Sequence, residues 1–278
     1  MRVWFITGAS RGFGALITAE ALAAGDAVVA TARDPSTVSA RFGENDRLLP
    51  VKLDVTNDTE VQAAAEAAIR KFGRIDILLN NAGYGLLGAV EEASAEEVQR
   101  LFATNVFGVL AVTRAVLPHM RRQHSGHVIN ISSIGGYRAY PGWGVYGSTK
   151  FAIEGITEAL ASEIAPLGIH ATVVEPGFFR TDFLDESSLV HTGQQLADYN
   201  ASVGRTRNAA GDLNHQQLGD PAKFAKAMMV LVNAPNPPVR LPLGSDTVRR
   251  IEAKNLEVVA ELTAWKDLAL STDWTEAA

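Results

Sequence analysis

Residues 3–14 read VWFITGASRGFG, and this stretch decides the fold. Its four apolar residues predict a short buried strand, and its glycines allow a tight turn before a helix begins. Such a turn lets a pyrophosphate approach the backbone and the free N–H groups of the helix. A glycine turn with only a structural role is the alternative. The G-x-x-x-G-x-G spacing makes this segment a candidate dinucleotide site, comprising Thr7, Gly8, Ser10, Arg11, Gly12, Phe13 and Gly14.

The rest of the chain repeats the order of strand and helix. Helical periodicity runs through 61–72 and 96–117, between short apolar runs that predict buried parallel strands. Alternation of this kind predicts βαβ crossovers and a doubly wound α/β sheet. The predicted strands are 3–7, 27–31, 48–53, 75–80, 127–131 and 170–174.

One domain, residues 1–278, is the better interpretation, because no repeat or linker interrupts the pattern before Pro176. Residues 178–219 are polar and irregular, which predicts a substrate lid or a disordered insert. Regular structure resumes with a helix at 221–232, which Asp220 caps and Pro221 opens. A last strand at 239–243, a helix at 248–265 and a frayed tail from Ser271 complete the prediction.

Composition excludes several classes of function. The net charge is −6 with both signs interspersed, which is not the basic footprint of a nucleic-acid or membrane-surface protein. No cysteine is present, which excludes disulfides and thiolate metal sites and fits a cytoplasmic location. The six histidines lack metal-binding spacing, so we predict no metal. We find neither a leader segment nor an apolar run of about 20 residues, and expect no membrane association.

The second predicted strand indicates the type of cofactor. A site for NAD usually carries an acidic residue at the end of this strand, which bonds the ribose 2′-OH. Here the strand ends in Arg33, and the first carboxylate is Asp34. Arg33 and Arg11 together suit a 2′-phosphate, so we predict NADP(H). The alternative is that both are solvated surface arginines.

Tyr146 and Lys150 are the first candidate catalytic pair. They lie four positions apart, which places both side chains on one face of a helix. A free tyrosine has a pKa near ~10, so it needs help to serve as an acid or base at neutral pH. Lys150 and an oxidised nicotinamide ring would supply that help by lowering the pKa. A simple surface pair on a helix is the alternative.

Other polar residues follow predicted strands at the same edge of the sheet. Ser133 follows the strand at 127–131, where its hydroxyl can hold a substrate oxygen or merely cap a turn. Asn105 falls inside a predicted helix, where asparagine is mildly unfavourable, which indicates a purpose or an indifferent surface position. Asn81, Ala82 and Gly83 follow the fourth strand and are candidates for the cofactor pocket. Candidates for an apolar pocket wall are Tyr137, Tyr140, Trp143, Phe179, Leu184, Leu86 and Leu87.

Taken together, these motifs resemble the short-chain dehydrogenase/reductase family over residues 2–181. The resemblance implies a Rossmann-like sheet of about seven strands with helices on both faces. It implies a catalytic tetrad in which Tyr146 exchanges the proton, Ser133 orients the substrate, Lys150 binds the nicotinamide ribose and Asn105 holds a water. Ala32-Arg33 is similar to the family's NADP-preferring variant. Further cofactor residues implied by the resemblance are Asp54, Val55, Asn81 to Gly83, Pro176, Gly177, Phe179 and Thr181.

The predicted activity is NADPH-dependent interconversion of a ketone or aldehyde with an alcohol. A weaker likeness to members related to 17β-hydroxysteroid and retinol dehydrogenases, in 237–244 and the 178–219 insert, implies substrates of some bulk. The family resemblance also implies a homodimer or homotetramer, formed through the helices that hold Asn105 and Tyr146. An NAD-dependent alcohol dehydrogenase is the alternative within the family, and a non-catalytic NADP-sensing regulator is the alternative outside it.

Overall fold

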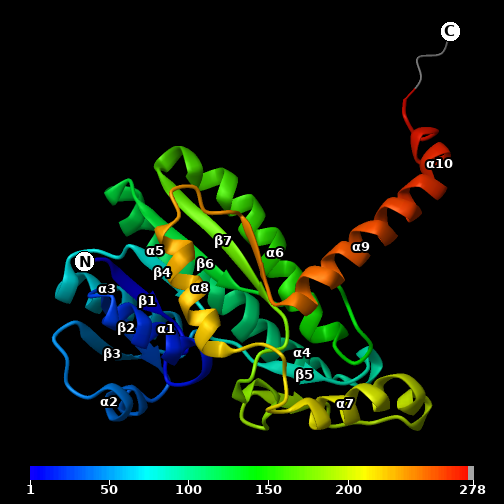
Figure 1. Cartoon of the computed structure of the whole chain (residues 1–278), viewed down its shortest axis with the longest axis horizontal. Helices are drawn as coiled ribbons and strands as arrows, with labels where there is room; N and C mark the ends of the chain where they lie inside the picture. The colour runs from blue at the N-terminus through cyan, green and yellow to red at the C-terminus, as the bar shows by residue number, and fades with distance from the viewer. Residues whose placement is uncertain (275–278) are drawn as a thin grey trace.

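A parallel sheet of seven strands forms the centre of residues 1–274, the part of the chain that the computed structural model describes (Figure 1). The strand order is β3-β2-β1-β4-β6-β7-β9, and every neighbouring pair is parallel. This arrangement confirms the predicted doubly wound, Rossmann-like sheet. The strands are β1 (Val3–Ile6), β2 (Ala27–Ala32), β3 (Leu48–Lys52), β4 (Ile77–Asn80), β6 (Gly126–Ile131), β7 (Ile169–Pro176) and β9 (Arg240–Leu243).

Helices cover both faces of the sheet. One face carries α1 (Gly12–Ala23), α2 (Ser36–Phe42) and α8 (Pro221–Asn233), whose apolar residues join one buried cluster. The opposite face carries α3 (Asp58–Phe72), α5 (Gly108–Gln123) and α6 (Gly144–Ile164), which form a second cluster. Both faces of the inner strands are therefore largely buried, as the nearly continuous apolar runs of the sequence predict, whereas the edge strands β3 and β9 are partly exposed.

Local capping explains where several helices begin and end. Asn57 precedes α3, and its side-chain oxygen accepts hydrogen bonds from the backbone N–H of Thr59 and Glu60. Gly73 ends the same helix with a φ of 76°, a conformation that favours glycine. Asp220 caps α8 by accepting from Ala222 N at 2.8 Å, with Pro221 in the first turn, as predicted.

The 178–219 insert is more regular than the sequence predicts. It contains β8 (Leu189–His191), which pairs in parallel with β5 (Gly85–Leu87) in a separate two-stranded sheet. It also contains α7 (Arg205–Leu213) and short helical turns at Asp182–Leu184, Ala197–Tyr199 and Asn200–Gly204. The disordered alternative was therefore wrong, and the role of the insert as a substrate lid stays a prediction. The pairing partner of β8 lies about a hundred residues earlier in the chain, where local sequence patterns cannot reveal it.

The helix predicted at 248–265 is α9 (Ser245–Ala264), and α10 (Lys266–Leu270) continues it. Both project away from the sheet and its covering helices (Figure 1). The last four positions of the tail that we expected to fray, residues 275–278, lie outside the described residues.

α4 (Ala95–Phe102) and α5 form one continuous helical stretch, Ala95–Gln123, joined by a π-helical turn at Ala103–Phe107. By length and composition this stretch meets the requirements of a membrane-spanning helix. Half of its most apolar window is buried inside the protein, and Val112, Val116 and Met120 belong to the core under the sheet. The apolar run is thus a packing face of the fold.

Candidate active site

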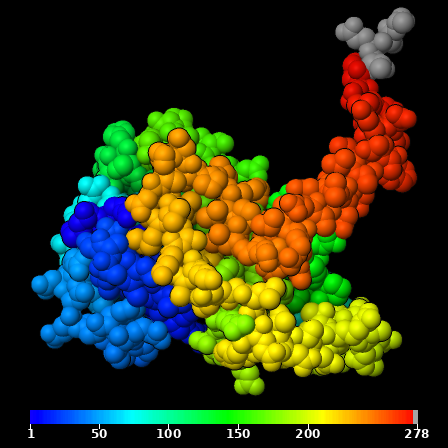
Figure 2. Space-filling view, viewed as in Figure 1, coloured from blue at the N-terminus to red at the C-terminus, as the bar shows by residue number. Residues whose placement is uncertain are grey.

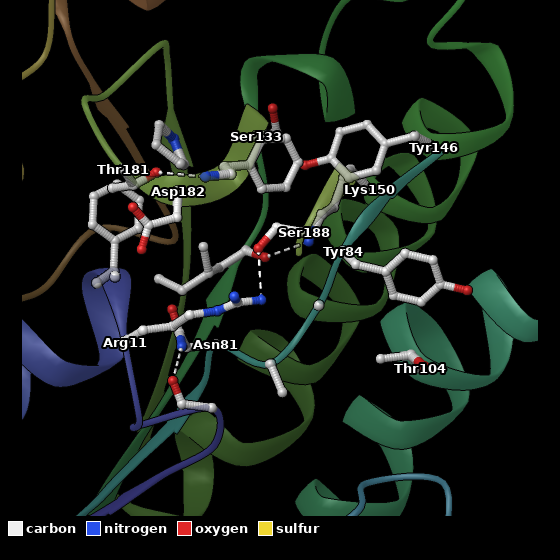
Figure 3. A pocket seen from close by; sticks show the side chains of 18 of the residues that line it. Arg11, Asn81, Tyr84, Thr104, Ser133, Tyr146, Lys150, Thr181, Asp182 and Ser188 are labelled. Atoms are coloured by element: carbon white, nitrogen blue, oxygen red, sulfur yellow. Dashed lines mark hydrogen bonds between the residues drawn. The ribbon is translucent and has the colours of Figure 1, made fainter. Parts of the chain in front are cut away.

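A cavity of about 690 Å³ opens at the carboxyl ends of the central strands. Loops that follow successive strands supply much of its wall, as expected for ligand sites in open parallel sheets. Figure 3 shows side chains of these loops pointing toward one another across the cavity. The loops are represented by Gly8 after β1, Arg33 after β2, Asp54 after β3, Asn81 after β4, Ser133 after β6 and Gly177 after β7.

Most of the site residues predicted from the sequence line this one cavity. Three do not, namely Thr7, Gly14 and Asn105, although they lie next to residues that do. Those in the wall are Gly8, Ser10, Arg11, Gly12, Phe13, Arg33, Asp54, Val55, Asn81, Ala82, Gly83, Ser133, Tyr146, Lys150, Pro176, Gly177, Phe179 and Thr181.

Thr7 and Gly14 shape the glycine turn from behind. The Thr7 hydroxyl accepts hydrogen bonds from Asn81 N and Ala82 N, at 2.9 and 3.0 Å. The Asn81 amide donates in return to the carbonyls of Thr7 and Gly8. A Cβ on Gly14 would lie 2.2 Å from the Gly8 carbonyl oxygen, so only glycine fits. These contacts lock the turn after β1 against the loop after β4. That Thr7 and Gly14 take part in cofactor binding stays a prediction.

Tyr146 lies in the first turn of α6 with its ring almost fully buried. Burial raises the pKa of its phenol, and a hydrogen bond with Ser133 opposes that rise. The Trp143 and Phe183 rings stand beside it, each with its centroid 5.6 Å from that of Tyr146 (Figure 3 labels Tyr146 and Ser133). In the protein alone the phenol is therefore protonated at neutral pH, the form that donates a proton to a carbonyl oxygen.

Lys150 lies one turn after Tyr146 and reaches the same cavity. Its Nζ donates to the Ile131 carbonyl at 3.0 Å and stands 5.7 Å from the centroid of the Tyr146 ring. Burial lowers the pKa of Lys150 to about 8, while Glu154, one further turn along α6, acts in the opposite direction. Lys150 is thus mostly protonated at neutral pH and faces the cavity as a cation. That it lowers the pKa of Tyr146 stays a prediction.

Asn105 does not line the cavity. It lies in the π-helical turn between α4 and α5 and is 1% exposed. Its amide donates to the Tyr84 carbonyl at 2.9 Å and to the Thr149 hydroxyl at 3.2 Å, and its oxygen accepts from Tyr84 N. The sequence misfit noted at Asn105 is thus a real π-bulge, a feature frequent at functional sites. Asn105 connects the loop after β4 to α6, close behind Lys150.

The two arginines predicted to bind a 2′-phosphate differ in their surroundings. Arg33 is exposed in the cavity wall and has no carboxylate within ion-pair distance among residues 1–274. Asp34 lies outside the wall, where it accepts hydrogen bonds from the backbone and hydroxyl of Ser36. Arg11 donates instead to the Ser187 carbonyl and the Ser188 hydroxyl, at 2.6 and 2.8 Å (Figure 3). Of these two arginines, Arg33 is the one without a hydrogen-bond or ion-pair partner among residues 1–274.

The insert supplies a second wall that the sequence analysis did not assign residue by residue. Among its members, Gln217 is the most informative, because it is 1% exposed and neither end of its carboxamide has a partner within residues 1–274. Buried polar groups in proteins normally have partners, so this amide is a candidate ligand contact. No motif marks it in the sequence. Wall residues from the insert that were not predicted are Asp182, Phe183, Ser187, Ser188, Val190 and Gln217.

The apolar candidates divide into two groups. Tyr140, Trp143, Phe179 and Leu184 line the cavity as proposed. Tyr137, Leu86 and Leu87 do not, because Leu86 and Leu87 are buried in β5 and the Tyr137 hydroxyl donates to Asn255.

One histidine lies beside carboxylates. His215 is 3.2 Å from Asp185, with Asp182 nearby. Asp185 also accepts a hydrogen bond from the Asn214 amide, and the His215 side chain is largely exposed. The group is an ordinary hydrogen-bonded surface network of the insert.

We compared the chain with known proteins over a region that includes the glycine turn, the cavity at the strand ends and the side chains of Ser133, Tyr146 and Lys150. Residues 2–190 match the model of the family described as short chain dehydrogenase. The chain belongs to the short-chain dehydrogenase family. This short-chain dehydrogenase is therefore an oxidoreductase, and its seven-stranded sheet is the fold of the family.

Curated and solved relatives cover nearly the whole chain. Oxidoreductase BOA17 of Botryotinia fuckeliana is 39% identical over 98% of this dehydrogenase and 99% of its own length. A 3-ketodihydrosphingosine reductase of Bacteroides thetaiotaomicron is 41% identical over 87% of this chain and 88% of its own. A short-chain dehydrogenase from Streptomyces avermitilis has a TM-score of 0.90 and 39% identity, covering 98% of this chain and all of that one. More distant solved neighbours hold NADH in one case and NADP in another.

Proposed function

We propose that this chain is a single-domain, NADPH-dependent reductase that interconverts a ketone or aldehyde with an alcohol, with Tyr146 as the acid/base. One observation carries the proposal. Tyr146, Ser133 and Lys150 meet in the same cavity as the glycine turn, so a proton donor faces the space where a nicotinamide dinucleotide fits. A protein that only senses the nucleotide would not need this set.

The proton chemistry follows from the side chains. In reduction, the Tyr146 phenol donates its proton to the substrate oxygen while the carbonyl carbon receives hydride, and in oxidation both return. Ser133, which hydrogen-bonds with Tyr146, also holds the substrate oxygen and so orients it. The cation of Lys150 stabilises negative charge on the phenol and so lowers the cost of its ionisation. Trp143 and Phe183 exclude water around the phenol.

The cavity wall fits a nicotinamide dinucleotide, which supplies or accepts the hydride when bound. The glycine turn at the start of α1 would hold the pyrophosphate, and Asp54 and Val55 would flank the adenine. The unpartnered amide of Gln217 and the Lys150 amine offer hydrogen bonds that a polar ligand would satisfy. Because Arg33 directly follows β2 in this wall and has no carboxylate within ion-pair distance among residues 1–274, we propose that it binds the 2′-phosphate and favours NADPH over NADH.

The substrate half of the cavity is largely aromatic. Trp143, Phe183 and Tyr146 form a cluster of rings, and Tyr140 and Leu184 extend the same wall. Rings of this kind provide a large apolar surface for bulky apolar groups, and they offer few hydrogen bonds to small hydrophilic molecules. We therefore propose bulky or aromatic carbonyl compounds as substrates, in preference to small hydrophilic ones.

The test is consumption of NADPH by the purified protein, followed by absorbance, over a panel of aliphatic, aromatic and polycyclic ketones and aldehydes. Loss of NADPH that depends on an added carbonyl compound, fastest with bulky apolar members, is the expected result. NADPH binding without consumption of any member would contradict the reductase proposal. Equal or faster use of NADH would contradict the cofactor assignment alone.

A further inference from the structure

The C-terminal arm, defined here as residues 245–270 of α9 and α10, projects from the rest of the molecule, while its base packs against the body, where Asp246 and Thr247 are buried (Figures 1 and 2). From Asn255 to Trp274 every residue is exposed. Three contacts fix its direction: Asp246 accepts from Phe178 N at 3.0 Å, Asn255 accepts from the Tyr137 hydroxyl, and Glu257 pairs with Arg138 at 2.8 Å. The arm is therefore a directed projection of the fold.

One face of this exposed arm is apolar. Val248, Ile251, Val258, Leu262 and Trp265 recur at spacings of three, four or seven residues, which places them within a sector of about 100° around the helix axis. Asn255, which accepts from the Tyr137 hydroxyl, is the polar residue in the middle of this sector. Leu262 is 62% exposed and Trp265 67% exposed. A single helix that projects into water has only marginal stability. Burying its apolar stripe against a partner would stabilise it further. The spacing is that of a two-helix seam, in which each apolar residue inserts between those of a partner helix.

The charges beside the stripe indicate what covers it. Five acidic and four basic side chains lie in the arm, a nearly balanced charge without the basic excess that an anionic membrane surface attracts. Lys254 and Glu261 lie on the same edge of the stripe, two helical turns apart. Opposite charges on one edge are complementary to the same edge of an identical helix running in the opposite direction. The charged edge of one arm is therefore complementary to the same edge of a second, antiparallel arm.

We propose that the arm pairs antiparallel with the arm of a second copy of this chain. Val248 then packs on the partner's Trp265, and Ile251 packs on the partner's Leu262. Lys254 faces the partner's Glu261, and the two-fold symmetry makes that ion pair twice. A large ring set against a small side chain fills the seam evenly.

Antiparallel pairing also separates the two globular bodies. Val248 and Ile251 lie at the base of the arm, next to the body of their own chain. In a parallel pair both bodies would meet at that end, with helix axes only about 8–10 Å apart. In the antiparallel pair each body lies beside the tip of the other arm. This interface is distinct from the helices that hold Asn105 and Tyr146.

The first test measures particle mass in solution by light scattering after gel filtration. Leu262→Asp places a carboxylate in the seam, and we expect the mass to fall to half that of the unmodified protein. Ala260→Asp is the matched control, because it adds the same charge on the opposite, exposed face of the same helix. Its mass should not change. Equal masses for all three proteins would overturn the proposal, and equal thermal melting of the variants shows that the body stays folded.

The second test reads the register. The chain has no cysteine, so engineered cysteines are the only thiols. The double variant Ile251→Cys with Leu262→Cys should form a disulfide-linked dimer on mild oxidation, because the two positions meet across the seam. Each single variant should stay monomeric on a denaturing gel, because its own counterpart lies about 16 Å further along the axis. Cross-linking by the single variants would show a parallel pair, and none by the double variant would show that the arm has another occupant; either result rejects the proposal.

Discussion

The cavity has two walls of different origin. One is the edge of the sheet, where the loops after β1, β2, β4, β6 and β7 place, in that order, the glycine turn, Arg33, Asn81, Ser133 and Gly177. The other is the 178–219 insert, which contributes Phe183, Ser188 and Gln217. The first wall is built by the hydrogen bonding of the sheet itself. The second is held by the pairing of β8 with β5 and by the hydrogen bonds of Arg11 to Ser187 and Ser188.

The two walls differ in the function that we expect of them: proton transfer at the sheet edge and ligand binding at the insert. The wall at the sheet edge holds the groups that move a proton and those that suit a dinucleotide, on a rigid scaffold. The wall from the insert adds aromatic and amide side chains whose identity suits a particular ligand. We expect substitutions in the first wall to change turnover and those in the second to change affinity.

The largest effect among the supporting residues is expected at Ser133. Ser133→Ala removes a hydroxyl that holds the substrate oxygen in the transition state, and turnover should fall about 10²-fold. Ser148→Ala is the control on α6, because its exposed hydroxyl only donates to the Val145 carbonyl. Steady-state rates with a fixed carbonyl substrate measure both. If Ser133→Ala raised KM and left kcat unchanged, Ser133 would contribute to substrate binding alone.

Arg33 should decide the choice of cofactor. Arg33→Ala removes a charge-assisted hydrogen bond of about 1.5–3 kcal/mol, so NADPH affinity should fall about 10- to 100-fold. NADH affinity should not change, because NADH has no 2′-phosphate. Arg41→Ala, an exposed arginine on α2, is the control. Fluorescence titration with both cofactors gives the ratio. Equal losses for NADPH and NADH would show that Arg33 does not read the phosphate.

Gln217 tests the wall from the insert. Its segment lies alongside Phe178–Arg180, and the Phe179 ring packs on Phe13 of the glycine turn, so we expect Gln217 to contact the cofactor. Gln217→Leu removes a buried amide without partners and should raise the melting temperature of the free protein by about 2–6 °C. It should at the same time weaken NADPH binding.

Gln216→Leu, at the exposed neighbouring position, is the control for this substitution. Thermal melting with and without NADPH measures stability and binding in one experiment. A destabilised Gln217→Leu protein that binds NADPH normally would assign Gln217 a structural role.

The smallest effect is expected at Glu154, a buried carboxyl on α6 behind the cavity. Glu154 is buried one turn after Lys150, and its neighbours are Arg240, Glu175 and, on the surface, Glu158. Burial and the nearby Glu175 raise the pKa of Glu154. The Glu154 carboxyl therefore stays protonated to a higher pH in the folded protein than in the unfolded chain. The contribution of this carboxyl to the free energy of unfolding is lost as the pH rises from the ordinary pKa of a glutamate toward the raised pKa.

Glu154→Gln keeps the shape and removes the titration. Its melting temperature should fall less between pH 5 and pH 8 than that of the unmodified protein, by a few degrees. Glu158→Gln, which changes the exposed member of the same cluster, should reproduce the unmodified profile. Parallel profiles for Glu154→Gln and the unmodified protein would show that Glu154 is not the titrating group.

Much of the fold could be predicted from sequence because its signals are local. Buried parallel strands are short apolar runs, so all seven central strands were found, with ends shifted by one or two residues. Asp220 and Pro221 marked the start of α8 for the same reason. The insert was misjudged because β8 is a three-residue strand stabilised by a distant partner. The face of α9 was likewise not interpreted, because periodicity alone does not show whether a stripe is covered.

The site divides in the same way. Glycine spacing and the four-residue step from Tyr146 to Lys150 are readable because they reflect turn and helix geometry. The contacts of Thr7 and Gly14, which shape the turn from behind, could not be predicted, because they involve the loop after β4 and a close approach to the Gly8 carbonyl. Gln217 was missed because an amide in a polar segment looks like many surface residues. Only its burial without a partner distinguishes it.

The central claim is that Tyr146 is the acid/base of this oxidoreductase. The most direct measurement compares Tyr146→Phe with the unmodified protein in two assays, turnover of a carbonyl substrate and fluorescence titration of NADPH. The account predicts that turnover falls about 10²- to 10⁴-fold while the dissociation constant for NADPH changes by less than about two-fold. Turnover that survives in Tyr146→Phe would contradict it.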